Sequence, residues 1–194
     1  MIKKAIFLIL FLLNTAFVFA QKPDSSVIKP GKIKNVEGAS MSSSNNIVVN
    51  ISSASNFSVL ANVIQVAGLT DTFNSGNPIT IFAPDNKAFE KLPVGKLDSL
   101  LLPAHKTELT NLLLYHAISV KITSKDIERQ IKAGNGQATF TTLSGGILTA
   151  RINENRNIVL TDDSGTQSVI SVLDVQQSNG ILFVITSVLM PRAK

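Results

Sequence analysis

Residues 79–93, ITIFAPDNKAFEKLP, describe a buried strand that turns directly into a helix, and they constrain the fold more than any other part of the chain. Two isoleucines alternate with Thr80, the period of two that is typical of a strand. Pro84 has no backbone N–H to give to a sheet, so we expect it to end the strand and to take the first position of the helix. Asp85 then places a carboxylate where the helix dipole is positive. A few residues therefore fix the direction of the chain on both sides of this turn.

Residues 1–20 have the three parts of a secretory signal peptide. Lys3 and Lys4 supply positive charge, an apolar run occupies residues 5–13, and Val-Phe-Ala precedes the expected cleavage before Gln21. The apolar run is shorter than the ~20 residues that a membrane-spanning helix needs, which favours cleavage over a retained anchor. We therefore expect a secreted, periplasmic or cell-envelope protein with no stable membrane insertion after cleavage.

Residues 21–46 are rich in Ser, Lys, Pro, Gly and Asn and show no sustained hydrophobic period. The few apolar groups in this segment cannot offset the entropy lost when the chain is ordered. This segment is therefore predicted to be a flexible linker. Residues 47–194 contain no internal repeat and are predicted to form one domain.

The first half of this domain has helical periods and the second half has strand periods. A short strand or lead-in is expected at residues 47–51, and helices are expected at 57–67, 69–73, 96–102, 106–115 and 125–132, the last capped by Ser124. Strands are expected at 116–120, 138–143, 147–152, 158–161, 169–175 and 181–186. Helices followed by strands indicate the α+β class with mainly antiparallel pairing.

The chain has no cysteine, which excludes disulfides, zinc–thiolate sites, iron–sulfur clusters and a lipid anchor on an N-terminal cysteine. Its formal net charge is +5, but the leader and the linker carry most of this charge. The one tight basic cluster, Lys29, Lys32 and Lys34, lies in the linker without aromatic neighbours. Nucleic acid is therefore not an expected partner.

Candidate catalytic residues are sparse. His105 stands at a polar helix start and His116 follows an apolar helix, and the Gly-x-Ser-x-Gly signature of a serine hydrolase does not occur. A hydrolase that works through His116 remains an alternative to the expectation of no enzymatic activity. Asp162 and Asp163 lie between two expected strands and precede Ser-Gly, which favours a turn over a cation site. No cofactor and no metal site is expected.

Three segments occur in the order and spacing of the signatures of the fasciclin (FAS1) domain family. Residues 79–89 resemble its first signature, a strand followed by Phe-Ala-Pro-x-Asn/Asp-x-Ala-Phe. Residues 112–116, LLLYH, resemble its central Leu-Leu-x-Tyr-His motif. Residues 179–191, NGILFVITSVLMP, are similar to its closing motif, an Asn-Gly followed by a strand and a Val-Leu-x-Pro end. Together the three segments extend over nearly all of residues 47–191.

The resemblance implies an α+β, FAS1-like wedge of antiparallel strands with several short helices packed around it. In animal members of the family, the Tyr-His motif and an Asp-Ile pair near the closing motif have been linked to receptor binding. The matching positions here are Tyr115, His116 and, loosely, Asp174, which makes them the candidate binding residues. Because Tyr115 and His116 stand where a buried helix meets a strand, we expect them to fix backbone groups rather than to contact a partner.

The closing strand departs from the family pattern, because Phe183 and Thr186 stand where a His and an Asp are usual. No receptor-binding role is therefore expected for this strand.

The resemblance also implies an exported, non-catalytic adhesion module that binds a protein or polysaccharide of the cell surface or matrix. The alternative is a periplasmic or secreted carrier of a small ligand, which would need an apolar cavity between helices and sheet with a few convergent polar groups.

Overall fold

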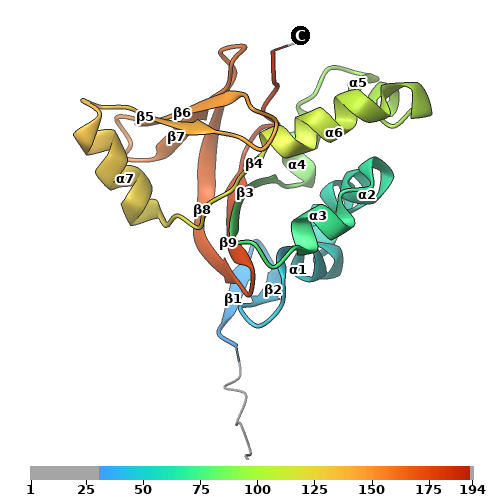
Figure 1. Ribbon diagram of the computed structural model, residues 1–194, viewed down its shortest axis with the longest axis horizontal. Helices are drawn as coiled ribbons and strands as arrows, with labels where there is room; N and C mark the ends of the chain where they lie inside the picture. Colours follow the sequence, from blue (N-terminus) through green and yellow to red (C-terminus); the bar gives the residue numbers. More distant parts are fainter. Residues whose placement is uncertain (1–30, 193–194) are drawn as a thin grey trace, which may run out of the picture.

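The computed structural model describes residues 31–192 and shows a wedge built on one seven-stranded sheet, with the order β4-β3-β9-β8-β7-β6-β5 (Figure 1). The strands of this sheet are β3 (Ile79–Pro84), β4 (Ala117–Ile118), β5 (Ala138–Thr141), β6 (Ile147–Ile152), β7 (Ile158–Thr161), β8 (Gln167–Gln177) and β9 (Gly180–Ile185). All neighbouring pairs are antiparallel except β3 and β9, which are parallel. The predicted α+β class with mainly antiparallel pairing is confirmed.

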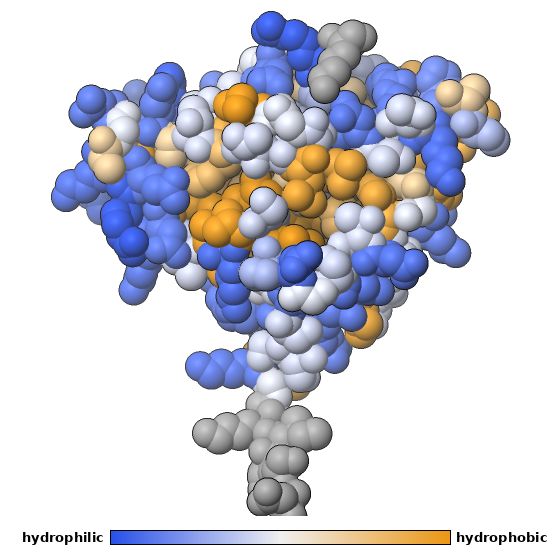
Figure 2. All heavy atoms as spheres, in the orientation of Figure 1, coloured by the Kyte–Doolittle hydropathy of each residue, from blue (hydrophilic) through white to orange (hydrophobic). Residues whose placement is uncertain are grey.

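The helices divide between the two sides of the sheet. They are α1 (Ile47–Ser53), η1 (Ser55–Phe57), α2 (Ser58–Ala67), α3 (Thr70–Asn74), α4 (Asn86–Glu90), α5 (Lys96–Leu100), η2 (Pro103–His105), α6 (Lys106–Tyr115) and α7 (Ser124–Ala133). Figure 1 shows α7 alone on one side and the other helices gathered on the opposite side. Between these two groups, apolar side chains reach the surface in the middle of the face that Figure 2 displays.

The strand-to-helix turn in residues 79–93 forms nearly as predicted. Pro84 ends β3, but the helix begins two residues later, because Asp85 is its N-cap and accepts a hydrogen bond from Ala88 N over 2.7 Å. All six residues of β3 are buried, including Thr80. The Thr80 hydroxyl donates to Val120 O (2.6 Å) and accepts from Ile122 N (3.0 Å), which satisfies a polar group in a central strand.

Residues 33–42 correct the linker prediction. They form a hairpin of β1 (Ile33–Val36) and β2 (Ala39–Ser42), which is a separate two-stranded sheet. Val36 and Met41 are fully buried in the core of the domain, which helps to order strands that are too short to show a period. The predicted signal peptide and the first part of the linker lie outside the described residues.

The strand or lead-in expected at residues 47–51 is also wrong, because this segment is the helix α1. Asn46 caps α1 by accepting from Val49 N (2.8 Å), and Asn50 is buried where it donates to Ser42 O (2.8 Å). β-Branched residues dominate the segment and favoured the strand reading, but tertiary packing decided the conformation. The following helix ends at Gly68 in the left-handed conformation (φ +74°), as predicted.

Apolar side chains form two cores. One packs the helices α1, α2, α3 and α6 against β3 and β9 and contains Phe57 and Phe73. The other lies between α7 and the strands and contains Phe82 and Phe183, whose rings stack with centroids 5.7 Å apart. Phe183, which departs from the family pattern, is therefore a core residue.

No single helix among the described residues is long and apolar enough to cross a membrane. The pair Ile47–Ser53 and Ser55–Ala67 has sufficient length and composition together, but it is bent by 106°.

Candidate functional site: a groove along the C-terminal segment

Tyr115 and His116 lie inside the protein at the junction of α6 and β4, with 0% and 1% of their surface exposed. The Tyr115 hydroxyl donates to Ile147 O (2.6 Å) and accepts from Asp163 N (2.9 Å). It therefore joins the end of α6 to the start of β6 and to the turn between β7 and β8.

His116 uses both ring nitrogens for backbone groups. Nε2 accepts from Leu189 N (3.0 Å), so the proton of the neutral ring sits on Nδ1, which donates to Leu112 O (2.8 Å). Burial lowers the pKa of His116 to about 4, because a charged imidazolium would be desolvated. Burial also raises the pKa of the Tyr115 hydroxyl above its ordinary value. Both side chains are thus neutral at physiological pH and serve as hydrogen-bonding anchors.

Asp162 completes this arrangement from the turn between β7 and β8. One carboxylate oxygen accepts from Ser164 N (2.9 Å) and Thr166 N (2.8 Å), and the other accepts from Met190 N (2.7 Å). The prediction of a turn at residues 162–165 is confirmed, and backbone N–H groups occupy the carboxylate that a cation would need. We call Tyr115, His116 and Asp162 the anchor network.

The anchor network fixes residues 187–192, which we call the C-terminal segment. Successive backbone N–H groups of this segment bind His116 and Asp162, at Leu189 and Met190 respectively. Gly146 also belongs to the surroundings, because a Cβ at this position would lie 2.4 Å from Cε2 of Tyr115. A buried ring therefore dictates a glycine in the turn between β5 and β6.

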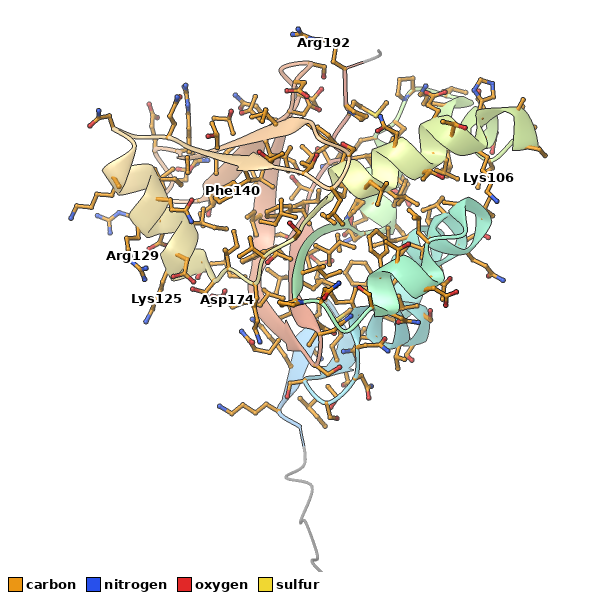
Figure 3. All side chains as sticks on the ribbon, in the orientation of Figure 1. Lys106, Lys125, Arg129, Phe140, Asp174 and Arg192 are labelled. Atoms are coloured by element: carbon orange, nitrogen blue, oxygen red, sulfur yellow. The ribbon has the colours of Figure 1, made fainter. Side chains whose placement is uncertain are left out.

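A groove follows the C-terminal segment on the protein surface. Its central part has a volume of about 560 Å³ and is lined by Lys96, Thr107, Glu108, Asn111, Leu112, Met190, Pro191 and Arg192. A hollow of about 350 Å³ continues it past Lys96 and Met190, and one of about 270 Å³ continues it past Asn111 and Arg192. Figure 3 shows Arg192 beside the C-terminal end of the chain, at the top of the molecule.

The groove combines an apolar floor with charged edges. Leu112, Met190 and Pro191 supply apolar surface. Lys96 Nζ lies 2.7 Å from Glu108 Oε1, and hydrogen bonds from Lys96 and His105 lower the pKa of the Glu108 carboxyl. Arg192 donates to Asp163 O (3.1 Å). Such a surface offers an apolar contact with charged groups that can orient a ligand.

Asp174 lies apart from the anchor network. It sits in a bulge of β8 with φ +54°, where its carboxylate accepts from Ser124 N (2.8 Å) and contacts the Ser124 hydroxyl. Figure 3 shows it at the start of α7, far from Arg192. Thr123, not Ser124 as predicted, caps α7 through a capping box with Asp126. The structure therefore brings Tyr115 and His116 together and leaves Asp174 outside the anchor network, against the start of α7.

Among the described residues, no group of three or more His, Cys, Asp or Glu side chains is arranged to hold a metal ion. His105 is exposed and pairs with Glu108 through Nδ1 (3.0 Å).

The sequence did not single out the groove. Lys96, Asn111 and Met190 belong to three separate segments, and no local pattern shows that they meet. Ser164 and Thr166 after Asp162 signal the turn, but the bond from Met190 spans 28 residues and has no counterpart in the sequence pattern.

The comparisons with known proteins agree with this architecture. The chain matches the Fasciclin domain family over residues 55–191 and belongs to this family. It is 36% identical to "Protein sll1483" of Synechocystis over 70% of this chain and 67% of that protein. It is 33% identical to "Transforming growth factor-beta-induced protein ig-h3" of Oryctolagus cuniculus over 71% of this chain, but only 18% of that protein. "Immunogenic protein MPB70" of Mycobacterium bovis is 34% identical over 64% of this chain and 55% of that protein.

A solved structure supports the fold. The FAS1 domain pair of the insect cell adhesion molecule Fasciclin I superposes with a TM-score of 0.65 over 77% of this chain and 51% of that chain, at 18% identity. The predicted FAS1-like fold is confirmed. The structure explains the glycine of the closing motif. A Cβ on Gly180 would lie 1.9 Å from Ile79 O, where β9 pairs with β3.

Proposed function

We propose that this chain is an exported, non-catalytic module that binds a protein or polysaccharide of the cell surface or matrix through the groove along the C-terminal segment. Membership of the fasciclin domain family supports an adhesion-type role, since one solved relative is an insect cell adhesion molecule. The observation that carries the proposal is the groove itself, which joins an apolar floor to charged edges.

The burial of His116 supports the absence of catalysis at this residue. A general base must reach a substrate proton within hydrogen-bonding distance, but both nitrogens of His116 are bonded to backbone groups. The anchor network acts on the groove indirectly, since Leu112 and Met190 line the groove and bond to His116 and Asp162.

Capture from surface or matrix extracts with the immobilised protein tests the proposal. Met190→Glu places a charge on the apolar floor and should reduce recovery of the bound component. Ile152→Glu is the matched control, because Ile152 is exposed at the end of β6 and does not line the groove. Recovery of no specific component, or equal recovery by both variants, would contradict the proposal.

The groove also suits the alternative function, a carrier of a small ligand, since an apolar floor with polar edges can bind an amphiphilic molecule. Native mass spectrometry of the gently purified protein separates the two functions. A retained small molecule that Met190→Glu releases supports the carrier, whereas an empty protein that still captures a surface component supports the adhesion module.

A further inference from the structure

Residues 38–70 contain no Lys, Arg, His, Asp or Glu. This stretch runs from the end of the hairpin turn through α1, η1 and α2, and both helices reach the surface. The exposed side chains of α1 and α2 are hydroxyl, amide or valine groups: Val49, Ser52, Ser53, Ser58, Asn62, Gln65 and Val66. We call the exposed side of α1 and α2 the neutral face. Figure 1 shows these helices on the opposite side of the sheet from α7.

The neutral face has both a hollow and exposed apolar side chains. Between α1 and α2 lies a hollow of about 550 Å³, lined among others by Val48, Ser52, Ala61 and Gln65. Val49 and Val66 are 45% and 38% exposed on the same two helices. A surface that lacks charged side chains in its middle is typical of the core of a protein–protein interface.

Other classes of partner fit the neutral face poorly. Phe57, the one aromatic residue of this stretch, is fully buried, so the face has no ring on which a sugar could stack. Anionic polymers and anionic membranes are bound by Lys and Arg, which the face lacks. A helix that lies in a membrane interface also normally presents Trp, Phe or Leu, whereas the exposed apolar residues here are valines.

We propose that the neutral face binds a second copy of this chain in a two-fold symmetric contact. In such a contact each patch meets itself, so a charge near the axis would face a like charge. The neutral face avoids this repulsion, and its two helices present both exposed valines and a hollow to a partner. This surface is separate from the groove along the C-terminal segment and does not depend on the function proposed for that groove.

Sedimentation of the purified protein over a range of concentrations tests the contact, with a matched pair of charge variants. Gln65→Glu places a carboxylate in the last turns of α2 beside the hollow. Gln130→Glu makes the same change at an exposed glutamine at a similar position of α7. The protein and Gln130→Glu should dimerise alike, while Gln65→Glu should weaken dimerisation by roughly tenfold or more, with the same melting temperature.

Opposite charges at position 65 of the two copies should restore the association. A mixture of Gln65→Glu and Gln65→Lys should associate more tightly than either variant alone, which a general loss of folding would not produce. A protein that stays monomeric up to about 1 mM, or equal weakening by both glutamates, overturns the proposal. Binding of the monomer to phosphatidylcholine vesicles without dimerisation also overturns it, because a lipid surface would then be the occupant.

Discussion

The anchor network and the neutral face contrast in side-chain type and in exposure to solvent. The anchor network consists of a tyrosine, a histidine and an aspartate, side chains that often act in binding and catalysis, yet all three are buried and bonded to backbone groups. The neutral face consists of serine, valine, asparagine and glutamine, which carry no recognisable motif, yet it lies open to solvent. The residues that identify the family therefore build the domain, and the surfaces available to partners are found only in three dimensions.

Gly146→Ala should be the most damaging change to the anchor network. The new methyl group would overlap the buried Tyr115 ring at 2.4 Å, and a ring packed on all sides cannot move away. We expect a loss of about 4 kcal/mol or more in unfolding free energy, measured by chemical denaturation. Gly76→Ala is the control, because a Cβ there meets nothing within 4 Å. Equal stability of the two variants would show that Tyr115 is not tightly held.

Acid should weaken the anchor network through His116. The pKa of this ring is lowered to about 4 in the folded protein from its ordinary 6.5, so the unfolded chain takes up the proton first as the pH falls. Stability is complete above pH 6.5 and decreases by up to ~3 kcal/mol as the pH falls towards 4. Denaturation at several pH values measures this slope. His116→Gln should flatten the slope; a slope that survives this substitution would assign it to other groups.

Asp162→Asn should cost ~2–3 kcal/mol. An amide can accept hydrogen bonds on one side only, so either the turn or Met190 N loses its charged acceptor. Glu154→Gln, a matched change at an exposed turn residue, should have almost no effect on the melting temperature. If Asp162→Asn and Glu154→Gln have the same melting temperature, the C-terminal segment is held by other contacts.

Tyr115→Phe should cost ~1–3 kcal/mol, because Ile147 O and Asp163 N lose their shared partner while the ring stays in place. Amide hydrogen exchange should show faster exchange at Asp163 in the variant. Protection of Asp163 equal to that of the unaltered protein would mean that this hydrogen bond does not form in solution.

Asn62→Lys, on the neutral face, should have the smallest effect on the fold. Asn62 is exposed on α2, and surface substitutions of this kind usually change stability by less than about 0.5 kcal/mol. A loss comparable to that of Tyr115→Phe would mean that the neutral face is part of the folded core and would remove the contrast between the two regions.

Local chemistry explains which parts of the fold the sequence predicts. The helix end at Gly68, the strands after residue 138 and the Asp85 carboxylate at a helix start each follow from a few adjacent residues. The resemblance to the fasciclin family supplied the arrangement of these elements and the expectation that Tyr115 and His116 fix backbone groups. It also implied an almost wholly antiparallel wedge, in which the parallel pair β3–β9 was not anticipated.

The errors come from contacts between distant segments. The hairpin at residues 33–42 is ordered because Val36 and Met41 enter a core made by helices that follow them. Residues 47–51 are helical because Asn46 caps the helix start and the buried Asn50 bonds to Ser42 and to Gln177 in β8. The groove depends on Lys96, Leu112 and Met190 meeting at the surface, and the anchor network holds two of these three residues, Leu112 and Met190. Side-chain type in the sequence therefore indicates most elements but not those that distant contacts order, nor the surfaces between elements.

Binding by the Tyr115→Phe variant tests most directly the claim that the family motif supports the fold while partners contact surfaces elsewhere. The affinity for the captured surface component should be measured at a temperature where both the variant and the unaltered protein are folded, beside Met190→Glu. The account predicts that Tyr115→Phe binds as well as the unaltered protein but melts at a lower temperature, and that Met190→Glu does the reverse. Loss of binding in Tyr115→Phe with an unchanged melting temperature would contradict it.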